Sequence, residues 1–280
     1  MSVSLVGLRC RTSDRTPGGA RGVEALAPLI GKRLGREPRL IGTPGEPRAA
    51  RFEDDLRDSR GCLLEAGGQV DDALTAGSFS LLLAGDCSIS LTTLPTVVRH
   101  RPEARILWLD AHGDFNTPDT TPSRFLGGMC LAGACGLWDA GIAATIAPER
   151  VVLAGVRALD GGERELLERG EATVIGASAM ETLVAVKNAL GRSPVYVHLD
   201  LDVLDPTEFP AQFPAPEGLS GEKLYDLLEA VSEECELVGL EVTGFEAPED
   251  ELERQAAAAT ALHVLEPLLD AIPEEARVGH

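Results

Sequence analysis

The segment Ile106-Leu-Trp-Leu-Asp110-Ala-His112-Gly-Asp114 decides the fold, because an apolar run changes abruptly into alternating acidic and imidazole side chains. A short apolar run bounded by polar residues is typical of a buried strand, here 106–109. In extended chain, alternate residues face the same side. Asp110, His112 and Asp114 should therefore converge on one point at the end of this strand, where they form a candidate metal site.

A second segment repeats the pattern ninety residues later. It reads Val195-Tyr-Val-His-Leu-Asp200-Leu-Asp202-Val-Leu-Asp205-Pro206, again an apolar strand that ends in carboxylates. Asp200 and Asp202 alternate and should share a face, whereas Asp205 before proline is as well explained by a turn cap. Two such strand ends side by side would provide ligands for more than one cation.

Short apolar runs alternate with amphipathic stretches along the chain. Strands are predicted at 2–7, 80–84, 106–109, 151–154, 195–201 and 237–242, and helices at 22–34, 221–233 and about 249–269. Several strands are apolar on both faces, as in parallel sheets covered by helices. The pattern predicts one α/β domain over 1–280, a three-layer sandwich with a central, mostly parallel sheet. Ligands bind such sheets at the carboxyl ends of the strands.

Composition excludes several classes of protein. The chain has 280 residues, 44% of them hydrophobic, which is enough for a large core. A net charge of -20 argues against nucleic acid or an anionic membrane as the main partner. No basic leader or membrane-length apolar run appears, so a cytoplasmic location is expected. Without C-x-x-C spacing, the six cysteines are predicted to be reduced thiols, namely Cys10, Cys62, Cys87, Cys130, Cys135 and Cys235.

Four motifs in order resemble the ureohydrolase superfamily, which contains arginase, agmatinase and formiminoglutamase. They are Gly85-Asp-Cys-Ser88, Asp110-Ala-His-Gly-Asp-Phe-Asn116, His198-Leu-Asp-Leu-Asp-Val-Leu-Asp-Pro206 and Gly239-Leu-Glu-Val-Thr-Gly-Phe-Glu-Ala-Pro248. The resemblance implies an arginase-like fold and two manganese ions bridged by a hydroxide that attacks a guanidinium carbon. Arginase relatives are often trimers or hexamers, which makes a homo-oligomer a candidate assembly.

Matching positions imply the metal ligands. The two overlapping sets are Asp110, His112, Asp200 and Asp202 for one ion, and Asp110, Asp114, Asp200 and Cys87 for the other. Carboxylates and imidazole suit Mn²⁺, and shared carboxylates can hold two ions about 3.5–4 Å apart. Asp114 is also expected to relay a proton to the departing amine.

The chain departs from the arginase pattern at three positions. Cys87 stands where a histidine ligand is usual, and a thiolate suits zinc or iron better than manganese. Either this metal position is weak, or Cys87 remains a thiol beside it. Gly127 replaces a histidine thought to shuttle protons. Gly244 follows Thr243 where a guanidinium-pairing glutamate is usual, and Glu246 is expected to replace it as a catalytic group.

The amino-acid end of the pocket keeps the arginase pattern. Asn116 and Ser123 match the residues that hold a substrate carboxylate, and Asp160 matches the one that faces the α-amino group. Loop stabilisation is the alternative role for Asn116 and Ser123. Gln212-Phe-Pro214 departs from the usual small-residue loop and indicates a reshaped pocket wall.

Together these features predict an α-amino acid substrate whose guanidino end differs from that of arginine. They resemble the branch that hydrolyses Nω-hydroxy-L-arginine to L-ornithine and hydroxyurea for D-cycloserine biosynthesis. One alternative is hydrolysis of another guanidino or formimino compound, such as arginine, agmatine or formiminoglutamate. Another is a metal-poor relative that binds a ligand without catalysis, although the other expected metal ligands are retained.

Overall fold

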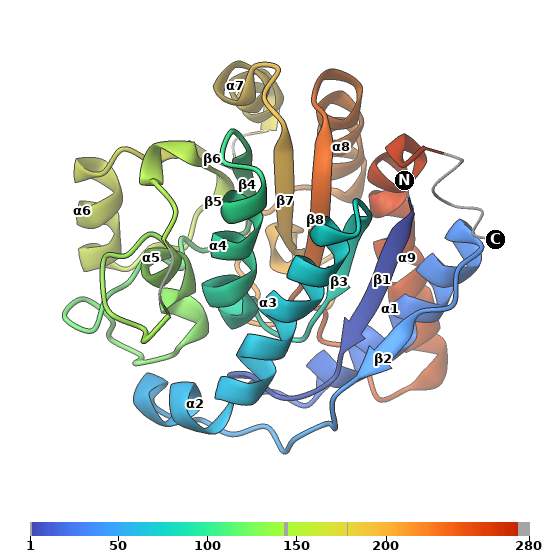
Figure 1. The fold of residues 1–280 in the computed structure, drawn as a ribbon, viewed down its shortest axis with the longest axis horizontal. Coiled ribbons are helices and arrows are strands. Elements are labelled where there is room, and N and C mark those ends of the chain that lie inside the picture. Colours follow the sequence, from blue (N-terminus) through green and yellow to red (C-terminus); the bar gives the residue numbers. More distant parts are fainter. Residues whose placement is uncertain (1, 143–144, 178, 274–280) are drawn as a thin grey trace.

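A central parallel sheet organises the molecule (Figure 1). The computed structural model describes residues 2–142, 145–177 and 179–273. Within them, eight strands are ordered β2-β1-β3-β8-β7-β4-β5-β6, and every neighbouring pair is parallel. The strands are β1 Val3–Leu8, β2 Arg39–Ile41, β3 Phe79–Leu83, β4 Arg105–Leu109, β5 Val151–Val156, β6 Thr173–Gly176, β7 Val195–Asp200 and β8 Leu237–Thr243. The predicted arginase-like α/β architecture is confirmed.

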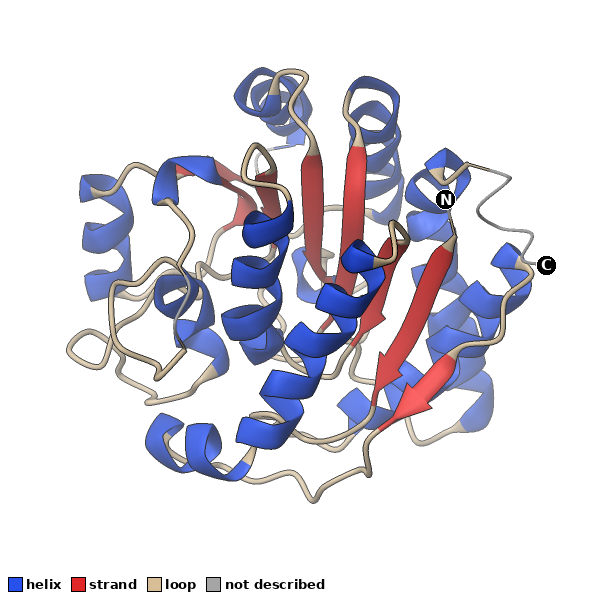
Figure 2. Ribbon diagram, in the orientation of Figure 1, coloured by secondary structure: helices blue, strands red, loops and turns tan. Residues whose placement is uncertain are grey.

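Helices cover both faces of the sheet (Figure 2). They are α1 Gly18–Leu34, α2 Phe52–Asp58, α3 Arg60–Thr75, α4 Ser90–His100, α5 Cys130–Ala134, α6 Gly161–Arg169, α7 Ala179–Leu190, α8 Gly221–Glu234 and α9 Glu251–Ala271. One core contains side chains of α1, α7, α8 and α9, and the other contains side chains of α2 to α6. Among the described residues, none of the helices combines the length and the hydrophobicity that a membrane span requires.

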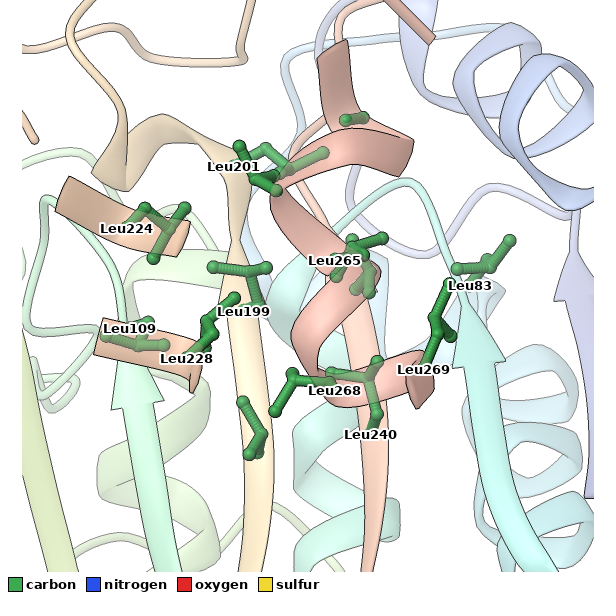
Figure 3. Packing of buried hydrophobic residues seen from close by; sticks show 14 of the residues in the cluster. Leu83, Leu109, Leu199, Leu201, Leu224, Leu228, Leu240, Leu265, Leu268 and Leu269 are labelled. Carbon is green, nitrogen blue, oxygen red and sulfur yellow. The ribbon is translucent and has the colours of Figure 1, made fainter. Parts of the chain in front are cut away.

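The apolar run before Asp110 is explained by burial on both faces. In β4, Leu107 and Leu109 join the core under α8 and α9, whereas Ile106 and Trp108 point into the opposite core. Figure 3 shows the leucine-rich side, where Leu109 and leucines of β7 and β8 lie beside leucines of α8 and α9. Because all four of these β4 side chains are fully buried, the run has no polar position until it reaches the carboxyl edge of the sheet.

The six predicted strands and three predicted helices are present, with bounds shifted by a few residues. Two strands were not predicted, β2 and β6, and both lie at the edges of the sheet. β2 has three residues, two of them exposed, and β6 alternates half-buried with exposed positions. Such short, partly solvated strands carry too little apolar pattern to separate them from loops.

The prediction of six reduced cysteines is wrong for two of them. Cys10, just after β1, and Cys62, in the first turn of α3, form a disulfide across 52 positions of sequence. Cys87, Cys130, Cys135 and Cys235 are free thiols. Sequence spacing could not reveal the pair, because only the packing of α3 beside the loop after β1 brings the two sulfurs together.

Candidate metal centre

The candidate site lies at the carboxyl ends of four adjacent strands, β3, β8, β7 and β4. A cavity of about 510 Å³ opens there. All predicted site residues except Glu246 line it, namely Cys87, Asp110, His112, Asp114, Asn116, Ser123, Asp160, Asp200 and Asp202. Residues from distant parts of the sequence therefore meet in one place, because the parallel strands all end at the same edge.

One half of the site is built around His112. Its Nδ1 lies 2.8 Å from the Oδ2 of Asp202 and 3.4 Å from the Oδ1 of Asp110. Each of the two carboxylates also accepts a hydrogen bond from a group outside the cavity lining. The indole N–H of Trp108 donates to Asp110 at 3.0 Å, and the backbone N–H of Ala111 donates to Asp202 at 2.9 Å. One donor atom from each of Asp110, His112 and Asp202 lies within 4.8 Å of the others, which is a spacing suited to a common cation.

Electrostatics support a cation in this site. Burial, and then the charges of neighbouring aspartates, raise the pKa of Asp114 and Asp202 well above the usual value and that of Asp200 to about 6. Burial alone would lower the pKa of His112, but Asp110 and Asp202 outweigh it and raise that pKa to about 12. The carboxylates outnumber the imidazole, so divalent cations would relieve their mutual repulsion. The donor set fits hard or borderline cations.

The other half of the site is built around Cys87, which begins a short 3₁₀ turn after β3. Its Sγ donates to the Oδ2 of Asp200 at 2.8 Å and lies 3.0 Å from the hydroxyl of Thr243. Burial, together with the charges of nearby aspartates, raises the pKa of the Cys87 thiol well above its usual value. Cys87 therefore lies within ligand distance of the cluster as a thiol, and a cation bound there would favour its thiolate.

Sequence reasoning missed His198 as a site residue. Its Nε2 lies 3.3 Å from the Sγ of Cys87. Donor atoms of Cys87, Asp110 and His198 form a second group within 4.8 Å of one another. The signal was present in the sequence, because His198 precedes Asp200 by two residues and continues the same alternation.

Two glycines occupy positions where arginases carry functional side chains, and other groups fill that space. Gly244 has a φ of +77°, and a Cβ there would collide with the carboxylate of Asp200. A Cβ on Gly127 would lie 2.5 Å from the ring of Phe125 and 3.1 Å from the Oδ2 of Asp86. Neither position could accept a larger residue without a shift of its neighbours.

Glu246 does not replace the missing glutamate, contrary to the prediction. It lies outside the cavity lining and accepts hydrogen bonds from the hydroxyl of Thr16 at 2.5 Å and the backbone N–H of Gly18 at 2.9 Å. The left-handed turn at Gly244 redirects the chain after β8. As a result, the carboxylate stabilises the amino end of α1, where exposed N–H groups favour negative charge.

The loop residues predicted to bind the amino-acid head lie together at one wall. Asn116 donates to the Oδ2 of Asp160 at 3.0 Å, and Asp160 caps α6 through a capping box with Glu163. The Oγ of Ser123 accepts the N–H of Phe125 at 3.2 Å. These bonds agree with the loop-stabilising alternative, and because the side chains also line the cavity, a substrate-binding role stays a prediction.

The reshaped wall consists of aromatic and amide side chains. Gln212 and Phe213 line the cavity, and the ring of Phe213 lies 4.9 Å from that of Phe125. The guanidinium of Arg15 sits 4.6 Å from the Phe125 ring centre, a cation–π distance. This wall lies at the edge of the site where Gly127 replaces the histidine of arginases.

Comparison with known proteins agrees with the fold and the motifs. Residues 50–268 match the arginase family. The chain is 36% identical to an Nω-hydroxy-L-arginine amidinohydrolase of Streptomyces lavendulae, over 96% of this chain and 98% of that protein. It is 34% identical to the arginase of Bacillus caldovelox over 69% of this chain and 70% of that protein. The structure of the Bacillus cereus arginase superposes with a TM-score of 0.83 and 26% identity, covering 96% of this chain and 98% of that one. The chain therefore belongs to the arginase family, the ureohydrolases, and is an amidinohydrolase of that family.

Proposed function

We propose that this enzyme hydrolyses Nω-hydroxy-L-arginine to L-ornithine and hydroxyurea. The observation that carries the proposal is the extent of the match to the Streptomyces lavendulae enzyme, which spans 96% of this chain, against 69% for the Bacillus caldovelox arginase. The hydroxyurea released would be available to D-cycloserine biosynthesis.

The amidine end of the cavity supports a substrate other than arginine. The carboxylate of Asp200 occupies the space that a side chain at position 244 would need, and it accepts a hydrogen bond from the hydroxyl of Thr243. Phe125 closes the space at Gly127. An Nω-hydroxyguanidine is less basic than a plain guanidine, so it needs less countercharge from the protein. The loss of one glutamate and one histidine is therefore compatible with this substrate.

The opposite wall supports an amino acid as substrate. Asp160 would accept hydrogen bonds from the α-ammonium group, and its orientation is already set by Asn116. Glu163 holds this wall in place, because its carboxylate accepts the backbone N–H groups of Phe115 at 2.8 Å and Asp160 at 3.2 Å. A cavity of about 510 Å³ is of the right order for an arginine-sized ligand.

Metal ions belong to the proposal. The residues that would hold them are Cys87, Asp110, His112, Asp114, Asp200 and Asp202. When bound, two divalent ions, expected to be Mn²⁺, would supply Lewis acidity and an activated water. Asp114, buried beside Asp110 and open to the cavity, would carry a proton to the departing amine. It has a φ of +48°, a strained backbone conformation of the kind that clusters at functional sites.

Four substrates offered separately to the Mn²⁺-loaded enzyme would test the proposal. They are Nω-hydroxy-L-arginine, L-arginine, agmatine and formiminoglutamate, with product release measured for each. Fastest turnover of the first, with ornithine and hydroxyurea in equal amounts, is the expected result. Fastest turnover of any other substrate would assign the enzyme to that compound. No turnover of any of the four after loading with either Mn²⁺ or Co²⁺ would indicate a relative that binds without catalysis.

A further inference from the structure

His198 lies behind the cavity in a fully buried position on β7. Its ring stacks on the indole of Trp108, with ring centres 3.5 Å apart and planes 4° from parallel. Its Nδ1 lies 2.7 Å from the Oε1 of Glu241, which is also fully buried. Glu241 further accepts the hydroxyls of Ser90 at 2.8 Å and Tyr196 at 3.0 Å. The stacking on Trp108 and the contact with Glu241 therefore fix both the position and the orientation of the imidazole ring.

The free end of this imidazole points toward the site. Its Nε2 lies 3.3 Å from the Sγ of Cys87 and 3.5 Å from the hydroxyl of Thr243. A histidine that ligates a metal usually donates its other ring N–H to a carboxylate, which fixes the tautomer and strengthens the ligand. The arrangement of Glu241, His198 and Cys87 has this form. Any buried histidine needs a partner on its ring nitrogens, so what distinguishes His198 is that its Nε2 side faces two further ligand-type groups, the Sγ of Cys87 and a carboxylate oxygen of Asp110, all within 4.8 Å of one another.

The two candidate ligand groups share one residue. Asp110 belongs both to the group with His112 and Asp202 and to the group with Cys87 and His198. A shared carboxylate between two imidazoles is the arrangement expected of a two-metal site. The second imidazole comes from β7, however, and not from position 87 after β3, where arginases carry their histidine.

We infer that His198 is the imidazole ligand of the metal position beside Cys87, oriented by Glu241, so that this position offers nitrogen, sulfur and carboxylate oxygen. The inference rests on the metal-dependent function proposed above. Such a donor set is softer than one of carboxylates and imidazole alone, and it favours Zn²⁺, Fe²⁺ or Co²⁺ over Mn²⁺. The two positions of the site would then differ in the cations they retain.

Cobalt titration of the metal-free full-length chain would test this assignment without any substrate. Cobalt content would be measured after gel filtration, and the thiolate-to-cobalt absorption would be followed in the near ultraviolet. The wild type should bind two ions and show this absorption. His198→Gln should lower the affinity for one ion by at least about 10-fold. It should also reduce the absorption, because less cobalt is then bound to the Cys87 thiolate. His112→Gln should lower the affinity for the other ion and leave the thiolate-to-cobalt absorption unchanged.

Controls separate a ligand from a structural residue. His263→Gln removes an exposed histidine that pairs with Glu266 and should change neither affinity nor absorption. Glu241→Gln should weaken the same ion as His198→Gln, but by less. Unchanged affinities and absorption in His198→Gln would overturn the inference, as would a wild-type chain that binds only the ion dependent on His112.

A measurement on the wild type covers the case in which His198→Gln does not fold. In the proton NMR spectrum of the cobalt-loaded chain, the Nδ1–H of His198 should give a paramagnetically shifted signal that exchanges slowly with water, because the ring is fully buried. The side chain of His112 is 29% exposed, so its N–H should exchange quickly. Absence of the slow signal would overturn the inference. Failure to hydrolyse Nω-hydroxy-L-arginine with the slow signal present would overturn only the proposed function.

Discussion

The two halves of the site differ in how closely they follow the arginase pattern and in how they meet solvent. His112 lines the cavity together with its partners Asp110 and Asp202. Both aspartates lie at the ends of strands, as the alternation of side chains in the sequence predicts. Cys87 is only 5% exposed and is backed by His198, Glu241 and Trp108, which are fully buried. The motif around His112, which follows the arginase pattern, therefore identifies the family. The Cys87 half departs from that pattern and combines residues from four strands, and its features bear on the substrate and the metal.

A carboxylate that contacts residues of both halves, Asp200, should show the largest effect. We expect Asp200→Asn to lower hydrolysis by at least about 1000-fold, roughly 4 kcal/mol of transition-state stabilisation, and to reduce the content of both metals. The cause is that Asp200 contacts Cys87 on one side and the backbone of Asp202 on the other. Steady-state kinetics and metal analysis would measure both effects. Asp205→Asn is the matched control, since Asp205 lies outside the cavity lining and accepts hydrogen bonds from Thr207 and the backbone of Gly218. Equal losses in the two variants would contradict the assignment.

The Cys10–Cys62 disulfide stabilises a segment that contacts the Cys87 half of the site. It anchors the loop in which Ser13 donates to Asp86, the residue before Cys87. We expect Cys10→Ser to lower the free energy of unfolding by about 2–4 kcal/mol, because a loop of this length loses its cross-link in the unfolded chain. Urea denaturation would measure the loss, and reductant should produce it in the wild type. Cys235→Ser, which removes a free thiol, should have little effect. Identical stability with and without reductant would contradict the disulfide.

The pH dependence of stability would test the wall beside the His112 half. Burial raises the pKa of Glu163 from its usual value of 4.5 to about 7. The folded state therefore holds this proton more tightly than the unfolded state, and stability falls as pH rises from about 4.5 to about 7, by about 3 kcal/mol. Glu163→Gln should make the slope shallower by this amount, while the part due to the buried aspartates Asp114, Asp200 and Asp202 remains. The slope is measured by denaturation of the metal-free chain at successive pH values, and an unchanged slope in the variant would show that another group titrates.

The amino-acid head group should show the smallest of these effects. If Asp160 binds the α-ammonium group, Asp160→Ala should raise KM by about 10-fold and change kcat less. Both halves of the metal site should stay loaded, which metal analysis would confirm. Gly161→Ala, at a neighbouring position with open space around it, is the control for local disturbance of α6. A fall in kcat at constant KM would mean that Asp160 acts in the chemical step.

Much of the fold and half of the site could be predicted because their causes are local. The apolar run at 106–109 reflects burial on both sides of β4, and the alternation after it reflects the extended backbone. Edge strand β6 was missed because half of its side chains meet solvent. The Cys10–Cys62 pair and the position of Glu246 depend on contacts between distant segments. The role of His198 could be predicted only in part. Its spacing two residues before Asp200 is evident in the sequence, but its carboxylate partner Glu241 lies on another strand.

Competition between two substrates tests the central claim most directly. The metal-loaded enzyme would receive equimolar Nω-hydroxy-L-arginine and L-arginine, and hydroxyurea and urea would be measured at low conversion, so that their ratio reports the ratio of kcat/KM. The altered Cys87 half and the occupied space at Gly127 predict hydroxyurea in excess by about 100-fold, roughly 2.7 kcal/mol. Urea in excess would contradict the account and make the enzyme an arginase.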